Sequence, residues 1–492
     1  MPRLRFLLSI LALASLVSLP AFAAQPVHPS RSKLQPCKAR RDGGEVEALC
    51  GQYQVWENRA AKAGRKITLK VLVLPALGPN PKPDPIVALG GGPGQAASAL
   101  TGMMSTAARQ DRDFLFVDQR GTGEPDRLQC LLGTPGDFQS LFNQLFPLDA
   151  VRRCREELGR KYDLTLYTTA AGADDLDEVR AWLGYGKLNL AGYSYGTRMA
   201  QVYLKRHPES VRTVTLWGSV PMDEALPISH SAGGQRSLDL VFELCEQEAA
   251  CRAKFPVRKD FQAVMARLDA GPVEVEVPHP ETGKPTRVRL PREVVNEALR
   301  TILYSAEEFT ALPLALHEAA AGDWKHLGEW VVQQRYGSLT GLAQGLFFSV
   351  TCAEDMPHIT AEMIAARTAG SFLRDDRVRR QKAACDLWPR ARLEPGYREA
   401  ARSDLPVLAI NGRLDPVTPP DFGRRTVASY PNSLFLEVPY EGHAISGDCP
   451  VRIAETFIDR GSLQGLDTSC LAQTKPVPFL LEPPKEEIKP FG

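Results

Sequence analysis

The stretch KLNLAGYSYGTRMA, residues 187–200, places Ser194 between two glycines and two tyrosines. An apolar run precedes this serine, and a segment of helical character follows it up to Pro208. Strand, sharp turn and helix is the context in which the pattern G-x-S-x-G forms a nucleophile elbow, with the serine hydroxyl exposed at the end of the strand. The pattern alone is weak, because an ordinary glycine-rich loop also matches it. With these flanks, we predict that Ser194 is a catalytic nucleophile.

Further short runs rich in β-branched residues predict strands on both sides of this stretch. They cover residues 66–77, 85–94, 113–123, 211–220, 405–416 and 433–444. Most are continuously apolar, as expected of strands that helices cover on both faces of a parallel sheet. Between them, residues 172–184 show a helical pattern with acids in the first turn. The alternation predicts an α/β fold with a mostly parallel sheet.

The strand pattern stops between residues 221 and 393, where the apolar spacing is mostly helical apart from a short strand pair suggested at 273–290. We expect this segment to be a largely helical cap, inserted before the last strands and lying over the carboxyl ends of the sheet. It would divide the core into residues 24–220 and 394–470. Residues 471–492 are rich in proline and charge and are expected to form an extended tail.

The first 23 residues predict a secretory signal peptide. Two arginines precede an apolar run from Phe6 to about Leu19, and the sequence AFA at 21–23 is a small-residue cleavage site. A membrane anchor is the alternative, but the run is shorter than the roughly 18 to 20 residues of a spanning helix. No stop-transfer segment follows, and no cysteine follows the cleavage site to take a lipid. We therefore expect an exported protein, periplasmic or secreted, without a membrane anchor.

Ten cysteines lie in the predicted mature chain, at positions 37, 50, 130, 154, 245, 251, 352, 385, 449 and 470. An even count in an exported protein indicates disulfides. The sequence leaves the connectivity open, and we expect nearest neighbours along the chain to pair, because this closes short loops. Metal binding is the competing role, but neither C-x-x-C nor H-E-x-x-H occurs. We expect no metal and no cofactor.

The charge balance argues against a nucleic-acid partner. Removal of the two signal-peptide arginines leaves 57 basic and 58 acidic residues, a net charge of −1. Nucleic-acid binding needs at least a basic footprint. The remaining chain of about 469 residues exceeds one ordinary core, so two domains or one core with a large insertion are expected.

A serine nucleophile needs a base to take its proton and an acid to orient that base. In elbow enzymes these partners follow in the order serine, acid, histidine. Of the eight histidines, only His443 follows a late predicted strand, and Asp415 comes directly after the strand before it. Asp421 and Asp448 are weaker candidates, and an Asx turn before the next proline is the alternative role for Asp415. The predicted catalytic set is Ser194, Asp415 and His443.

The tetrahedral intermediate of acyl transfer also needs backbone N–H donors for its oxyanion. One donor is expected from Tyr195, the residue after the nucleophile, and the other from the loop after an early strand. The sequence ALGGGPG at 88–94 is that loop, and its glycines let the backbone approach a substrate closely. We expect Gly91 to be the donor, with Gly92 next. A glycine turn without a catalytic role is the alternative.

Taken together, these motifs resemble the α/β-hydrolase serine aminopeptidases. The motifs are GGGPG at 90–94, DQRGTG at 118–123, GYSYG at 192–196, GRLDPVTP at 412–419 and EGHA at 441–444. The family includes the proline iminopeptidases and the tripeptidyl aminopeptidases, and the latter are more similar in length and in their exported, cysteine-bearing layout. Proline iminopeptidases usually have a histidine where Gly90 stands, which favours the tripeptidyl branch. The resemblance implies an α/β-hydrolase fold and a partner that is a peptide with a free N-terminus.

In this family, acidic residues of the cap hold the N-terminal ammonium of the substrate. The sequence FFSVTCAEDMPH at 347–358 offers Glu354 and Asp355 next to an apolar run, so the resemblance implies that they bind substrate. A helix-terminal acid pair or a surface salt bridge is the alternative. Arg120, in DQRGTG, is expected to brace its loop by pairing with Asp118.

Two other function classes stay open at this point. A secreted carboxylesterase or lipase-like hydrolase could use the same triad, because a triad does not choose between amide and ester. A noncatalytic binding protein could keep the fold, but the complete set of serine, aspartate and histidine argues against it.

Overall fold

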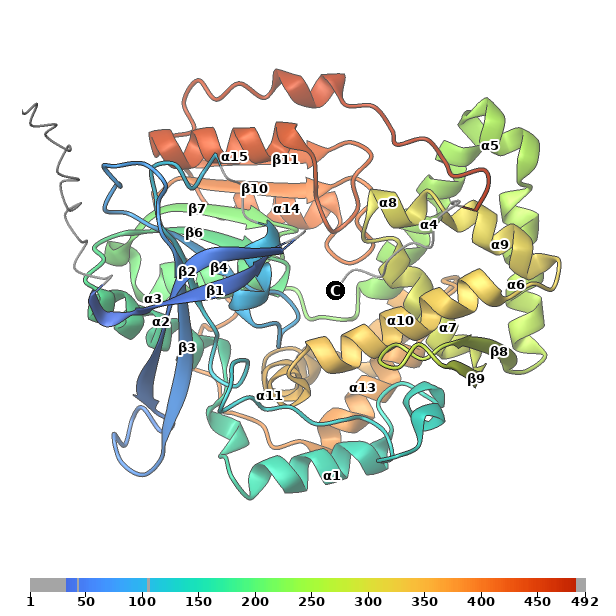
Figure 1. Cartoon of the computed structure of the whole chain (residues 1–492), viewed down its shortest axis with the longest axis horizontal. Coiled ribbons are helices and arrows are strands. Elements are labelled where there is room, and N and C mark those ends of the chain that lie inside the picture. Colours follow the sequence, from blue (N-terminus) through green and yellow to red (C-terminus); the bar gives the residue numbers. More distant parts are fainter. Residues whose placement is uncertain (1–31, 42–43, 104–106, 484–492) are drawn as a thin grey trace, which may run out of the picture.

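The computed structural model describes residues 32–41, 44–103 and 107–483 (Figure 1). The predicted signal peptide lies outside the described residues. Within those residues, no helix has both the length and the apolar character that crossing a membrane requires.

The core is a nine-stranded sheet with the spatial order β1-β2-β3-β5-β4-β6-β7-β10-β11. Its strands are β1 (Gln35–Arg41), β2 (Gly44–Trp56), β3 (Lys66–Leu74), β4 (Ile86–Leu89), β5 (Phe114–Val117), β6 (Leu188–Tyr193), β7 (Val211–Trp217), β10 (Val407–Gly412) and β11 (Ser433–Val438). From β5 across to β11 all neighbouring strands are parallel. The pairs that involve β1, β2 and β3 are antiparallel. Every predicted strand run contains a strand, so the α/β fold is confirmed.

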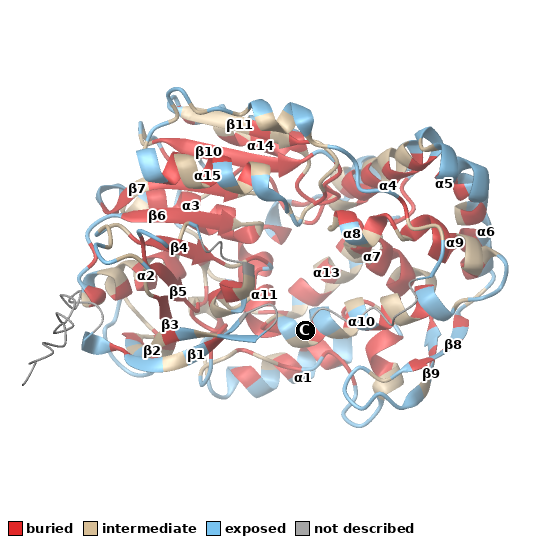
Figure 2. Ribbon diagram, turned by 45° about the horizontal axis from the view of Figure 1, so that its top comes forward, coloured by how far each residue is buried: buried red, intermediate tan, exposed pale blue. Residues whose placement is uncertain are grey.

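The central strands are buried along their whole length, as their continuous apolar runs predict. All residues of β4 and β5 are buried, and Figure 2 shows β4, β5 and β10 in red. Successive residues face opposite sides of the sheet. Val87 belongs to the same buried cluster as Leu176 and Met199, whereas Ala88 belongs to a second cluster that includes Phe457. The sheet therefore has helices on both faces.

Five helices belong to the two core segments. They are α1 (Leu148–Gly159), α2 (Thr169–Leu183), α3 (Tyr195–Arg206), α14 (Pro420–Val427) and α15 (Asp448–Arg460). The predicted helix at 172–184 is α2. It starts where the Thr168 side chain accepts a hydrogen bond from the backbone N–H of Ala171, and it ends at Gly184, whose φ of 80° suits a left-handed cap.

The chain between β7 and β10 forms the predicted helical segment, on the right of Figure 1. Its helices are α4 (His230–Gln247), α5 (Ala249–Lys254), α6 (Val257–Asp269), α7 (Arg292–Ile302), α8 (Ala306–Phe309), α9 (Leu312–Ala320), α10 (Lys325–Gly341), α11 (Gln344–Glu354), α12 (Ala361–Thr368) and α13 (Asp376–Leu387). The strand pair suggested at 273–290 is the hairpin of β8 (Val273–Pro278) and β9 (Pro285–Leu290). Helix α1 comes from the first core segment but packs against α11 and α13, so the cap is not built from the insertion alone.

All ten cysteines form disulfides between nearest neighbours in the chain, as predicted. The pairs are Cys37–Cys50, Cys130–Cys154, Cys245–Cys251, Cys352–Cys385 and Cys449–Cys470. The fourth pair joins helices α11 and α13 within the cap.

The described part of the tail is extended, and it is docked. After the last core helix the chain crosses from the core to the cap (Figure 1). There Phe479 is buried with 6% of its surface exposed, and the backbone N–H of Leu480 donates to the carbonyl oxygen of Thr310 at 3.1 Å. The chain therefore returns to the cap after the core, and we call this crossing segment, residues 474–483, the strap.

Candidate active site

Ser194 stands on a strained turn between β6 and α3. Its φ of 55° and ψ of −122° lie in a region that residues with a side chain rarely occupy. The flanking glycines make the turn possible. A Cβ atom on Gly196 would lie 2.1 Å from the carbonyl oxygen of Leu89, and one on Gly192 would lie 2.4 Å from that of Gly196. The glycines of G-x-S-x-G are thus required by close backbone packing.

Asp415 and His443 are hydrogen-bonded, with 2.7 Å between Oδ2 of the aspartate and Nδ1 of the histidine. The other oxygen of Asp415 accepts from the backbone N–H groups of Val417 and Thr418, both at 2.8 Å. The Asx turn and the histidine contact therefore coexist in one carboxylate, whose side chain has no exposed surface. Asp421 and Asp448, the weaker candidates, are exposed in the first turns of α14 and α15.

Ser194 and His443 both lie next to the corner that follows β7. The backbone N–H of Ser194 donates to the carbonyl oxygen of Trp217 at 2.8 Å. A Cβ atom on the next residue, Gly218, would lie 3.0 Å from Cε1 of His443. The three predicted residues follow β6, β10 and β11, and parallel strands bring their carboxyl ends to one edge of a sheet. The structure therefore gathers Ser194, Asp415 and His443 at that edge.

The glycine loop after β4 lies directly against the serine. A Cβ atom on Gly91 would be 3.2 Å from Cβ of Ser194, so Gly91 lies beside that serine, where an oxyanion donor is expected. Its backbone N–H donates to Oε1 of Gln95 at 2.9 Å, and a substrate oxygen would have to replace that contact. The backbone N–H of Tyr195 is the first of helix α3, where N–H groups lack an acceptor within the helix.

Glu354 and Asp355 lie at the end of α11, with 0% and 2% of their surface exposed. Glu354 accepts hydrogen bonds from the backbone and hydroxyl of Thr169, both at 2.8 Å, and from the hydroxyl of Tyr397. Asp355 forms an ion pair with Arg198 at 2.7 Å. Burial raises the pKa of Glu354, while the hydrogen bonds from Tyr397 and Thr169 oppose this shift. The predicted anchor role stays a prediction, and these internal partners favour a structural role.

Arg120 does brace its loop, but the predicted partner is wrong. Its guanidinium binds both carboxylate oxygens of Asp175, at 2.7 and 2.8 Å. Asp118 instead accepts from the backbone and the hydroxyl of Ser98, at 2.7 and 2.9 Å. A guanidinium matches a carboxylate in a bidentate pair, and helix α2 delivers Asp175 from a separate segment of the chain.

Several contacts of the site were not predicted. Thr418 donates from its hydroxyl to Oδ2 of Asp415 and lies 3.0 Å from Nδ1 of His443. Tyr304, from the cap, packs its ring against His443 with centroids 4.7 Å apart. A hydroxyl three residues after an aspartate is a usable signal for the first contact. No local signal marks Tyr304, because it reaches the site only through the cap.

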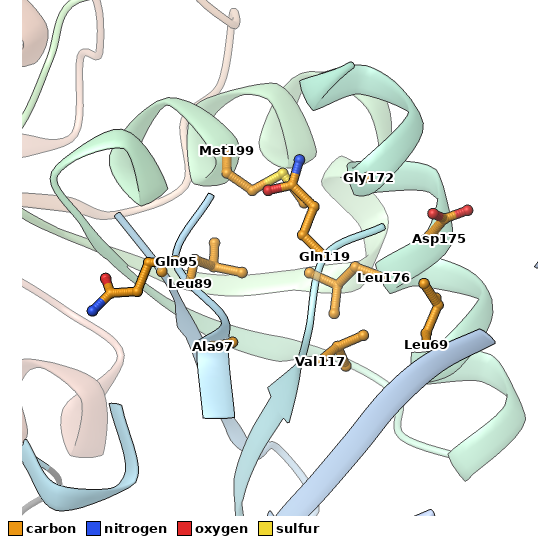
Figure 3. A pocket seen from close by; sticks show the side chains of 11 residues that line it. Leu69, Leu89, Gln95, Ala97, Val117, Gln119, Gly172, Asp175, Leu176 and Met199 are labelled. Atoms are coloured by element: carbon orange, nitrogen blue, oxygen red, sulfur yellow. The ribbon is translucent and has the colours of Figure 1, made fainter. Parts of the chain in front are cut away.

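A cavity of about 20 Å³ lies behind the glycine loop, between the sheet and helices α2 and α3 (Figure 3). This volume holds roughly one water molecule. Gly90, Gln119 and Met199 are among the described residues that line it, and none of the three predicted catalytic residues is. The cavity lies behind the elbow and is not where a substrate would meet Ser194.

Two family matches cover the parts of the chain that hold these motifs. Residues 84–240 match the α/β hydrolase fold. Residues 371–470 match the family described as TAP-like protein. The first match contains the glycine loop and the elbow, and the second contains Asp415 and His443.

Individual relatives include named peptidases. The serine protease Hip1 of Mycobacterium tuberculosis is 24% identical over 437 residues, which cover 78% of this chain and 80% of that protein. The tripeptidyl aminopeptidase of Streptomyces lividans is 33% identical over 116 residues, 21% of each chain. Among solved structures, a proline iminopeptidase of Mycobacterium smegmatis is 16% identical, with 84% of this chain and 98% of that chain covered and a TM-score of 0.34.

Proposed function

Since the chain belongs to the α/β-hydrolase peptidase family, we propose that it is an exported serine aminopeptidase that hydrolyses peptides from a free N-terminus. In this proposal Ser194 is the nucleophile, His443 the general base and Asp415 the residue that orients the base. The observation that supports it most directly is the Asp415–His443 hydrogen bond at 2.7 Å beside the strained serine. Asp415 is held by two backbone N–H groups, so its second oxygen has one fixed direction.

The proposed reaction follows from this arrangement. The Oγ atom of Ser194 attacks the scissile carbonyl while Nε2 of His443 takes its proton. The carboxylate of Asp415 holds the Nδ1–H tautomer and stabilises the imidazolium that forms. The N–H groups of Tyr195 and Gly91 receive the negative oxygen of the tetrahedral intermediate. His443 then returns the proton to the leaving amine, and water hydrolyses the acyl-enzyme by the same steps.

Covalent labelling tests the nucleophile. We expect a fluorophosphonate probe to modify the folded protein once, on the peptide that contains Ser194, and to leave the Ser194→Ala variant unlabelled. Asp415→Asn should label far more slowly than wild type, and Asp421→Asn is the matched control that should label normally. Labelling of another serine in the folded protein would remove Ser194 from the mechanism.

The requirement for a free N-terminus is tested with paired substrates. An ammonium removed from water must be paired, and an uncompensated buried charge costs roughly 3 to 5 kcal/mol, or two to four powers of ten in kcat/KM. N-acetylated peptides should therefore be very poor substrates beside the same peptides with a free amine. Equal turnover of both forms would exclude the aminopeptidase and favour an esterase or endopeptidase.

The anchor for that ammonium is tested by the same pair of substrates. If Glu354 or Asp355 binds it, Glu354→Gln or Asp355→Asn should reduce the preference for free over acetylated peptides. Glu441, two residues before His443, is the comparison. Burial and the charge of Glu307 raise its pKa to about 7. A preference lost in Glu441→Gln but kept in the other two variants would move the anchor to the His443 loop.

Export is supported by the five disulfides, which persist in oxidising compartments. Expression with and without residues 1–23, followed by fractionation and N-terminal sequencing, tests it. Mature protein that begins near residue 24 outside the cytoplasm is the expected result, and uncleaved protein in the cytoplasm would contradict it.

A further inference from the structure

The cap contains a cavity of about 60 Å³ between helices α7, α10, α11 and α13. This volume has room for a few water molecules or one small polar group. Its walls are partly apolar, with Phe146, Leu339 and Phe347, and partly charged, with Glu297, Arg335 and Arg377. None of these residues has a role in the proposed mechanism.

The charges around this cavity do not balance. Glu297 is the acid of the group, and both Arg300, at 2.6 Å, and Arg377 bind the same oxygen of its carboxylate. Arg335 donates only to backbone carbonyl oxygens in the contacts found for it, those of Leu141 and Gln144 at 3.0 and 3.1 Å. Two guanidiniums therefore share one carboxylate, and the third, that of Arg335, makes no ion pair with it. The nearby Glu293 adds no free negative charge, because it is paired with Arg380.

The surplus positive charge is held away from water. Arg335 and Arg300 are buried with 9% and 4% of their surface exposed. Nε of Arg377 is also buried and has no hydrogen-bond partner among the described residues. Burial lowers the pKa of Arg335 to about 10 and lowers that of Arg377, yet guanidiniums stay charged at neutral pH. A buried cation without an acid partner favours the arrival of an anion.

Two walls of the cavity continue into the candidate active site. Thr301 lines the cavity and lies about one helical turn before Tyr304, whose ring packs on His443. Leu342 also lines the cavity, and its Cδ2 would be 3.4 Å from a Cβ atom on Gly92. From Glu297 to Tyr304 is seven residues, the last two in the turn after α7, and the rise is about 10 Å, which is the length of about three residues of extended peptide.

From this geometry we propose that the cavity is a subsite for a carboxylate of the substrate. The carboxylate is either the C-terminus of a short peptide or an acidic side chain about three residues from the scissile bond. This inference rests on the proposed peptidase function, because it assigns a specificity element to the same site. A cationic cavity repels an ammonium, so the subsite does not receive the N-terminus. Carboxylates suit it because they accept parallel hydrogen bonds from guanidiniums.

Calorimetry on the full-length mature Ser194→Ala variant tests the subsite without requiring turnover. The probes are tripeptides to pentapeptides in matched pairs, with a free or amidated C-terminus and with Glu or Gln at each position. A charge-assisted hydrogen bond predicts that the carboxylate form binds about tenfold to a hundredfold more tightly. The C-terminal pairs and the side-chain pairs identify the source of the carboxylate.

Substitutions then show whether the arginines are responsible. Added to Ser194→Ala, Arg377→Gln should reduce the preference to less than about threefold, whereas Arg377→Lys should keep part of it. Arg379→Gln, on the same helix but exposed and paired with Asp375, is the matched control and should keep all of it. If Arg377→Gln folds poorly, judged by its melting temperature, Arg335→Gln gives the same test.

Equal affinity for acidic and neutral peptides overturns the inference, and so does a preference that survives both Arg377→Gln and Arg335→Gln. Failure of the proposed function is a separate result. In that case the wild-type protein cleaves no peptide, whatever its affinities, and its hydrolysis of a neutral p-nitrophenyl ester reports whether the triad still works.

Discussion

The edge of the core sheet and the interior of the cap both gather charged side chains, but by different means. At the sheet edge, Ser194, Asp415 and His443 each follow a parallel strand, so their distance from an apolar run fixes their place in space. In the cap, Glu297 and Arg377 meet because two helices far apart in the chain cross. Parallel strands convert sequence position into spatial position, and packed helices do not. The sheet edge is therefore predictable from sequence, whereas the cap needs coordinates.

The same difference between the sheet edge and the cap is seen in the hydrogen-bond partners of two buried carboxylates. The side chains of Asp415 and Glu354 are both without exposed surface. Asp415 turns one oxygen towards His443, whereas both oxygens of Glu354 are bound by Thr169 and Tyr397. Equal burial thus accompanies a proposed catalytic role in one case and internal bracing in the other.

The largest expected effect falls on the sheet edge. Ser194→Ala and His443→Ala should each reduce kcat by about 10⁶, because loss of either member disables the whole set. The melting temperature should change little, because neither substitution opens a core cavity. Initial rates with a chromogenic peptide and a neutral ester measure the effect. If a variant keeps more than a tenth of the wild-type rate, the substituted residue is not catalytic, and its position after a strand did not indicate its role.

Asp415→Asn should reduce kcat by about 10⁴, because the amide favours the wrong tautomer of His443. Glu354→Gln should change kcat for a neutral ester by less than about threefold, because that reaction needs only the triad and the oxyanion donors. The pair of variants sharpens the contrast between the two buried carboxylates. Similar losses of kcat in both would show that Glu354 acts in the chemistry.

The disulfide of the cap should affect stability more than catalysis. Replacing Cys352 and Cys385 by serine opens a loop of 33 residues and should lower the free energy of unfolding by about 3 to 4 kcal/mol. Urea denaturation measures the loss, and the ester rate at low temperature should stay within about threefold of wild type. A variant with wild-type stability but no activity would contradict the prediction that this disulfide serves stability and not catalysis.

The smallest expected effect is a pH dependence within the cap. Burial, together with repulsion from Glu307, raises the pKa of Glu308 from 4.5 to about 7. The stability contributed by protonation is fully present below pH 4.5 and is lost as the pH rises through about 7. Glu308→Gln should therefore stabilise the protein more at pH 8 than at pH 5, by about 1 kcal/mol after allowance for solvent screening. Melting curves at both pH values measure it, with the half-buried Glu329→Gln as control. An equal shift at both values would contradict the prediction.

Sequence alone predicted the other strands of the described residues and missed β1 and β2 at the antiparallel edge of the sheet. Strand β2 has only two buried positions, Ala48 and Val55, among its 13 residues, so it shows no continuous apolar run. Together with β1 it extends the antiparallel side of the sheet, away from the candidate site. Both strands are paired by backbone hydrogen bonds, which a hydropathy pattern does not report.

In the candidate site, too, the residues that directly follow strands could be predicted, and the contacts made across the fold could not. Asp415 and His443 were found because each follows a strand, and their hydrogen bond agrees with that placement. Gly218 and Tyr304 were missed because their contacts with His443 depend on how a corner and the cap fold around it. The partner of Arg120 was assigned to its own loop, although a separate helix supplies it.

The strap gives the molecule a further connection between core and cap, in addition to those that enter and leave the insertion and those that lead to and from α1. A lid attached only where an insertion enters and leaves it can swing as on a hinge, but an attachment at Thr310 and Phe479 resists that rotation. Substrate entry is then expected through small local displacements instead of wide opening. For protein engineering, a fusion partner joined to the C-terminus would pull on the cap and not on the core.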